Sequence, residues 1–147
     1  MPLKNDTQNG IDNHHLAEVI KRNREAGKRA ESYLFSVFNK IMQELESQVT
    51  IRINGTDIRV RVDAMGFKVD ENGNRKLKIL EFKASKTAPL TKNQKTGFPL
   101  LAERGGTVVG RKKPRIPYKN GYVVQPGTQI EVIRIDEGGK RYVSDRF

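Results

Sequence analysis

The first regular pattern in the chain is a helical spacing of apolar residues. After Gly27, apolar side chains recur at intervals of three and four residues, which is the period of one face of an α-helix. The series consists of Ala30, Tyr33, Leu34, Val37, Phe38, Ile41, Met42 and Leu45. It predicts a helix over residues 28–47. Residues 1–12 are polar and include an Asn9-Gly10 turn signal, so we expect a flexible tether there and a single folded domain over residues 13–147.

The period then changes to two, which is typical of half-buried β-strands. Two hairpin turns are predicted in this region, one at Asn54-Gly55 and one across residues 71–74. The strands that flank these turns are expected at residues 49–53, 58–62, 66–70 and 76–83. We therefore predict three or four consecutive antiparallel strands after the first helix.

The C-terminal half predicts a second helix followed by short strands. Thr91 and Gln94 form a capping-box pattern that opens a short helix, which Pro99 should disturb within two turns. Further strands are expected near residues 108–109, 122–124, 130–135 and 142–143, the last two joined across residues 137–139. The predicted fold class is α/β. Its elements follow the order α, β, β, β, α, β, with a central mixed sheet that is entered by antiparallel strands and flanked by helices, plus a small C-terminal β extension.

The chain carries a large excess of basic side chains. Lys and Arg total 28 against 17 Asp and Glu in 147 residues, a formal net charge of +11. Such an excess is typical of proteins that bind polyanions, although a merely soluble surface is the alternative. We expect nucleic acid and no membrane insertion, because no apolar run approaches the roughly 18 residues that span a bilayer. Cysteine is absent, which excludes thiol catalysis and cysteine zinc sites, and we expect no secretory signal in this chain.

The strand predicted at residues 76–83 contains an unusual pair of charges. Leu77 and Ile79 point to one face, and Glu81 and Lys83 continue that face where a structural strand would place two more apolar residues. Ionised groups in such a place cost several kcal/mol unless they are paired, hydrogen-bonded or bound to a metal. The alternative is an ordinary ion pair at the sheet edge.

A second carboxylate is predicted beside Glu81. Asp63 ends the preceding predicted strand, and the turn at residues 71–74 folds the chain back so that the two carboxylates can meet. They repel each other unless a cation lies between them, and Mg2+ takes carboxylate oxygens, a backbone carbonyl and waters. The neighbouring Lys83 can then position or deprotonate a water for in-line attack on a phosphodiester. A salt bridge from Asp63 to Arg59 or Arg61 is the alternative.

A third carboxylate comes from the predicted helix. Glu31 falls on the same stripe as Leu34 and Phe38, at a position where an apolar residue would be expected. Two explanations remain open: Glu31 is an accessory acid of the site, or it is a first-turn Glu that complements the helix dipole.

Together these residues resemble the PD-(D/E)XK, or restriction-endonuclease-like, nuclease superfamily. The likeness covers roughly residues 25–100, with Asp63 as the motif acid, Glu81-Phe82-Lys83 as the E-x-K motif and Glu31 as the helical acid. It implies a restriction-endonuclease-like core in which Asp63, Glu81 and the Phe82 carbonyl hold Mg2+, with Mn2+ or Zn2+ as alternatives. It also implies that Lys83 activates water and that Glu31 orients water or a second ion. Val62 stands where the family has proline.

The segment after Lys83 has a narrower likeness. Residues 83–94, KASKTAPLTKNQ, followed by Gly97-Phe98-Pro99, resemble the toxin domains of bacterial polymorphic toxins of the contact-dependent inhibition and type VI effector kinds. By this resemblance Gln94 contacts the scissile phosphate or the attacking water, a role compatible with its capping box. The likeness further implies a larger secreted parent, delivery into the cytoplasm of a target cell, and a cognate acidic immunity protein. DNA is the expected substrate, with transfer RNA as the alternative.

Two basic segments are candidates for contact with a phosphate backbone. The first is a proline-broken loop at residues 111–119, in which Tyr118 is available to stack on a base. Its expected nucleic-acid-binding residues are Arg111, Lys112, Lys113, Arg115 and Lys119. The second lies on the first helical region, at Lys21, Arg22, Arg24, Lys28 and Arg29. The alternative to a nuclease is a catalytically silent, basic nucleic-acid-binding module in which Glu81 and Lys83 are only an ion pair.

Overall fold

The computed structural model describes residues 2–110 and 117–147, and side chains from residue 17 onward except that of Ile20. Two helices and seven strands are found in these ranges: α1 (Pro2–Asn39), β1 (Gln43–Ile53), β2 (Arg59–Val69), β3 (Arg75–Lys83), α2 (Lys92–Arg104), β4 (Gly106–Val108), β5 (Val123–Val124), β6 (Gln129–Ile135) and β7 (Arg141–Arg146). All seven strands belong to one mixed sheet with the order β5-β4-β1-β2-β3-β6-β7. The predicted α/β class is therefore correct.

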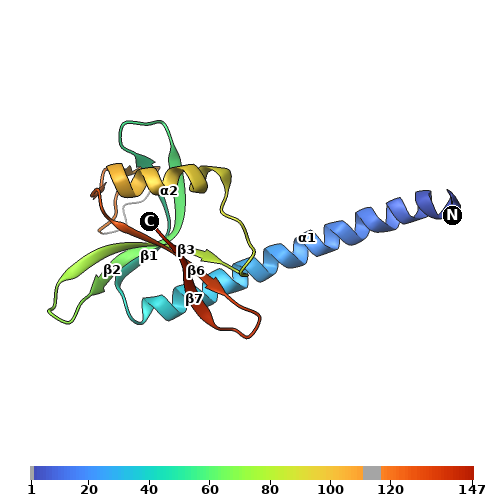
Figure 1. Cartoon of the computed structure of the whole chain (residues 1–147), viewed down its shortest axis with the longest axis horizontal. Helices are drawn as coiled ribbons and strands as arrows, with labels where there is room; N and C mark the ends of the chain where they lie inside the picture. Colours follow the sequence, from blue (N-terminus) through green and yellow to red (C-terminus); the bar gives the residue numbers. More distant parts are fainter. Residues whose placement is uncertain (1, 111–116) are drawn as a thin grey trace.

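The sheet lies between the two helices (Figure 1), and one apolar cluster lies on each of its faces. On one face, Phe98 and Leu101 of α2 pack against Val62 and Ile79 of the sheet. On the other, the C-terminal part of α1 contributes Leu34, Phe35 and Phe38 to a smaller cluster; Phe38 stacks on Phe82, with ring centroids 5.9 Å apart. Strand β3 is covered on both sides, as its two apolar faces predict.

The first helix ends earlier than its apolar spacing predicts. We expected a helix to residue 47, whereas α1 ends at Asn39 and β1 begins at Gln43. Met42 and Leu45 are buried, but they reach the α1-side cluster from the connection and the strand. The expectation was wrong because pairing of Gln43 with Phe67 begins the sheet here, and apolar spacing alone cannot separate these two arrangements.

At its other end, α1 extends further than expected. Residues 1–12 were predicted to have no fold of their own, whereas the structure begins α1 at Pro2. The N-terminal part of this helix projects away from the sheet, and only the C-terminal part packs on it (Figure 1). Among the residues that the structure describes, no helix is both long and apolar enough to cross a membrane.

The second helix forms as predicted at its start and runs through Pro99. Thr91 caps α2 with a complete capping box, in which the side chains of Thr91 and Gln94 each accept the other's backbone N–H. Pro99 lies inside the helix without ending it, and α2 runs on to Arg104. Pro99 does not interrupt the helix, because Phe98 and Leu101, on either side of the proline, are both fully buried against the sheet. This packing outweighs the roughly 3 kcal/mol that proline costs inside a helix.

Two other expectations about the strands need correction. The two strands predicted at residues 58–62 and 66–70 are replaced by one continuous strand, β2 (Arg59–Val69), so three antiparallel strands follow α1 and Asp63 lies inside β2 instead of at a strand end. The C-terminal strands are also not an extension. β6 pairs in parallel with β3, from Lys78–Gln129 to Lys83–Arg134, and so lies inside the main sheet.

Helix α2 approaches the sheet so closely at Gly97 that a side chain there has no room. A Cβ at Gly97 would lie 2.5 Å from Val60 Cγ1 and 3.3 Å from Ile53 Cδ1. Gly97→Ala is therefore expected to lower the free energy of unfolding by about 1–3 kcal/mol. Gly27→Ala is the matched control, because a Cβ at this helical glycine meets nothing within 4 Å and should leave stability unchanged or raised. Urea denaturation measures both; equal stabilities would contradict the close packing.

Candidate active site

The regular alternation of β1 and β2 breaks where the candidate site forms. Leu45 and Val49 are four residues apart and should share a face of the strand, yet they belong to opposite apolar clusters. The same change of face separates Val62 from Ala64 on the neighbouring strand. Gln48, between the first two, has a positive φ of 56°. The change of face makes room for polar side chains between two apolar clusters.

Asp63 lies at this break and turns toward the end of β3. Its Oδ2 accepts a hydrogen bond of 2.7 Å from the Phe82 backbone N–H. The β2–β3 ladder has its last pair at Ala64 and Leu80. Beyond that pair, the Asp63 side chain, and not a backbone carbonyl of β2, accepts the hydrogen bond from the Phe82 N–H. Burial raises the pKa of Asp63, and the Phe82 hydrogen bond and the charge of Lys83 offset part of that rise.

Glu81 is the most deeply buried member of the cluster, at 3% exposed. Its Oε2 accepts a 2.7 Å hydrogen bond from Gln94 Nε2 and lies 3.3 Å from Lys83 Nζ. Its Oε1 is buried and has no hydrogen-bond partner in the described part of the chain. An unpartnered buried carboxylate oxygen is costly unless another ligand completes it.

The surroundings of Glu81 disfavour its charged form. Burial and the nearby charge of Asp63 raise the pKa of Glu81 from 4.5 to about 8, although Lys83 and Gln94 act in the opposite direction. Because the pKa values of both carboxyl groups are raised, a cation between them would stabilise their charged forms.

Glu31 joins the cluster through a residue that sequence analysis missed. The Gln48 side-chain amide donates to Glu31 Oε1 and, more weakly at 3.4 Å, to Asp63 Oδ1. Burial and the charge of Asp63 raise the pKa of Glu31. Gln48 lies at the junction of the predicted helix and strand, where no pattern singles it out. The hairpin register would have found it, because the Val49–Val62 pair puts Gln48 opposite Asp63.

Lys83 and Gln94 are held together by the loop between β3 and α2. Lys83 Nζ donates to Gln94 Oε1 at 3.3 Å, so Gln94 contacts both members of the E-x-K motif while it serves the capping box. The loop itself is fixed by Arg134, a buried side chain of β6 that donates to the Ser85 and Ala88 carbonyls at 2.9 and 2.6 Å. Arg134 is a second residue that sequence analysis missed; its place in the alternating strand 130–135 carries no such signal.

A small cavity opens beside this cluster. It measures about 270 Å3 and is lined by Glu31, Ser32, Phe35, Ser47 and Gln48. A second cleft, of about 570 Å3, lies near the opposite end of β3, contains Leu77 and Gln129, and has no carboxylate in its lining. Within the described ranges, no three side chains from His, Cys, Asp and Glu are grouped closely enough to hold a metal ion.

The predicted basic loop is only partly described. Arg111, Lys112, Lys113 and Arg115 lie outside the described residues, and Lys119 is exposed. Tyr118 is fully buried, stacks on Phe67 and meets Tyr122 edge to face. The expectation that Tyr118 stacks on a base was therefore wrong: its ring belongs to the core, and burial raises the pKa of its hydroxyl.

Comparison of the chain with models of known protein families, with curated proteins and with solved structures finds no match.

Proposed function

We propose that the protein is a divalent-metal-dependent nuclease whose active site consists of Asp63, Glu81, Lys83 and Gln94, with Glu31 as an accessory acid. The observation that carries the proposal is the pairing of Asp63 with Glu81, whose Oε1 is buried without a partner and whose pKa is raised to about 8. A structural ion pair would not need two carboxylates beside one lysine. A cation held between them explains both features.

The donor set fits a hard cation such as Mg2+, with Mn2+ or Zn2+ as alternatives. The ligands would be the carboxylates of Asp63 and Glu81 and the backbone carbonyl of Phe82, whose N–H already faces Asp63 and whose C=O points to the same edge of the strand. When bound, the ion neutralises phosphate charge and lowers the pKa of a water nucleophile.

The remaining residues act around this ion. Lys83 would hold the attacking water and take or return its proton, and Gln94 would orient that water or a phosphate oxygen, because its amide already contacts both Glu81 and Lys83. Glu31, linked to Asp63 through Gln48, would bind a further water at the edge of the cavity. The first turn of α2, which contains Gln94, favours an anion at the same place.

The wider role rests on resemblance. The E-x-K motif and the segment that follows it support a restriction-endonuclease-like core and an interbacterial toxin domain. Such a domain would be delivered into a target cell by a larger secreted protein and neutralised by an acidic immunity protein. DNA is the favoured substrate, and a transfer RNA nuclease is the alternative.

Removal of the metal tests the proposal directly. Purified protein is expected to nick supercoiled plasmid or to cut total transfer RNA in Mg2+ or Mn2+, and EDTA should abolish the activity. Lys83→Met should lose cleavage but keep salt-sensitive binding of nucleic acid. Activity that is indifferent to EDTA, or a Lys83→Met variant as active as the parent, would reject the nuclease. Binding without cleavage in any metal would favour a silent binding module.

A further inference from the structure

The N-terminal helix carries an exposed row of basic side chains that leads away from the candidate active site. Lys21, Arg22, Arg24, Lys28 and Arg29 are all exposed. In the part of the chain that the structure describes, none of them forms a salt bridge with a carboxylate. Residues 17–30 contain only two acidic side chains, Glu18 and Glu25. Unpaired cations on an exposed helix have no structural partner to account for them.

Part of this row is aligned with the active site. Arg24 and Lys28 lie seven and three residues before Glu31, and residues at these intervals share one face of a helix. Lys21 continues the row, three residues before Arg24. At a rise of about 1.5 Å per residue, Lys28, Arg24 and Lys21 are roughly 5, 10 and 15 Å from Glu31 along the axis. Arg61, which is near enough to Glu31 to lower its pKa, adds a cation at the near end.

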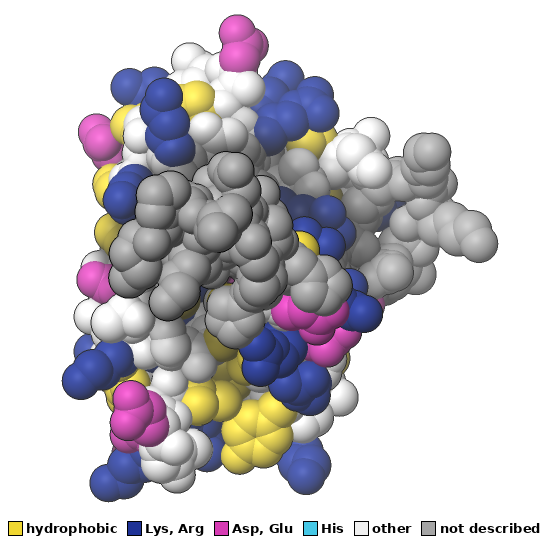
Figure 2. Space-filling view, turned by 90° about the vertical axis from the view of Figure 1, so that its right-hand side faces the viewer, with side chains coloured by type: hydrophobic (Ala, Val, Ile, Leu, Met, Phe, Trp, Pro, Cys, Tyr) yellow, Lys and Arg dark blue, Asp and Glu magenta, His cyan; other side chains and the backbone are white. Residues whose placement is uncertain are grey.

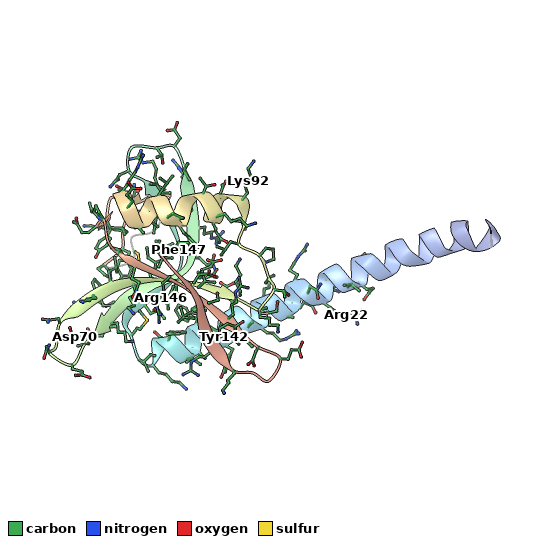
Figure 3. The ribbon with its side chains drawn as sticks, viewed as in Figure 1. Arg22, Asp70, Lys92, Tyr142, Arg146 and Phe147 are labelled. Atoms are coloured by element: carbon green, nitrogen blue, oxygen red, sulfur yellow. The ribbon has the colours of Figure 1, made fainter. Side chains whose placement is uncertain are left out.

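The projecting part of α1 lies on the same side of the fold as the start of α2, the helix that contributes Gln94 to the candidate site. In Figure 3, Lys92 at the start of α2 and Arg22 on the projecting part of α1 lie on the same side of the molecule, whereas Asp70 of the β2–β3 hairpin lies at the opposite end. Viewed from that side, Lys and Arg side chains are more widespread than Asp and Glu (Figure 2). A polyanion that reached the site would meet this helix next.

We propose that residues 21–29 of α1 form an arm that binds the phosphate backbone of a nucleic acid beside the cleavage point. The proposal relies on the proposed function only for placing that point at Glu81. A rigid helix presents its cations along a fixed line, and about 15 Å corresponds to roughly five base pairs of a duplex. The contacts are to phosphate and carry no base specificity.

Binding of 30-base-pair DNA and RNA duplexes, measured by fluorescence anisotropy in EDTA, tests the arm without cleavage. Arg24→Gln/Lys28→Gln should weaken binding about tenfold and reduce the slope of log affinity against log salt by about two, one for each lost phosphate contact. Lys68→Gln/Lys76→Gln is the matched control, since it removes two exposed cations from the β2–β3 hairpin. Equal losses in the two variants would overturn the arm.

A cross-linking experiment makes the same test independently of charge. Because the chain has no cysteine, a single Lys21→Cys variant can carry a photoreactive probe, with Lys76→Cys as control. Bound duplex should cross-link to the first and not to the second; the reverse would overturn the proposal. If the parent protein cleaves nucleic acid but Arg24→Gln/Lys28→Gln binds it normally, only the arm is rejected. If binding depends on the arm but no cleavage is seen in any metal, only the nuclease is rejected.

Discussion

Glu81→Gln is expected to reduce phosphodiester cleavage by about a thousandfold or more while leaving the fold intact. The substitution keeps the shape of the side chain and removes half of the carboxylate charge that would hold the ion. A loss of about 4 kcal/mol of transition-state stabilisation corresponds to that factor. Stability should stay level or rise, because burial beside Asp63 already disfavours the Glu81 charge. Single-turnover cleavage and urea denaturation measure the two effects.

Glu131→Gln is the matched control for this experiment. Glu131 is also a buried carboxylate of the sheet, but it is paired with Lys78 at 3.2 Å and Arg146 at 2.9 Å. Its loss should lower stability by about 1–3 kcal/mol and leave the rate of cleavage unchanged. Glu81→Gln is thus expected to lose activity and keep its stability, whereas Glu131→Gln is expected to lose stability and keep its activity. If Glu81→Gln lost stability as Glu131→Gln does and kept its activity, Glu81 would be a structural residue.

The second large effect is a dependence of stability on pH in the metal-free protein. The pKa of Glu81 is raised from 4.5 to about 8, so between these values the folded chain keeps a proton that the unfolded chain has released. The stabilising effect is complete below pH 4.5 and is lost as pH rises toward 8. The shift at Asp63 has the same sign. Urea denaturation in EDTA at several pH values should therefore show stability falling across this range.

Mn2+ should reverse this trend. Because the ion binds the deprotonated carboxylates, its affinity should increase with pH up to about 8, and binding below that value should release protons. At a hundred times its Kd it would add about 2.7 kcal/mol to the free energy of unfolding. Glu81→Gln should show both a flatter pH profile and little stabilisation by Mn2+. A profile identical to that of the parent protein would remove Glu81 as the source of the effect.

Sequence patterns were sufficient for the parts of the fold that local physics determines. The alternation of apolar residues located the β1–β2 hairpin and β3, and the Thr91–Gln94 pair located the start of α2, because turn and capping chemistry act within a few residues. The end of α1 and the passage of α2 through Pro99 were missed, since both depend on tertiary pairing or packing. The parallel β3–β6 pair was missed for the same reason: it joins residues about fifty positions apart.

In the candidate site, too, local sequence patterns predicted some residues, and contacts that form only on folding brought in the others. Glu81 and Lys83 were predicted because two charges interrupt an apolar face, and the structure brings them together with Asp63 and Gln94. Gln48 and Arg134 were not predicted. Each acts through a contact that arises only after folding, Gln48 as a bridge between Glu31 and Asp63 and Arg134 as the anchor of the loop after Lys83.

A crystal of the protein soaked in Mn2+ gives the most direct test of a cation site between Asp63 and Glu81. The anomalous signal of manganese is expected at one position, with an oxygen of each carboxylate about 2.0–2.3 Å from the ion and Glu81 Oε1 no longer without a partner. A well-ordered pair of side chains with no anomalous peak between them at saturating Mn2+, or a peak only elsewhere on the molecule, would contradict the metal-dependent site.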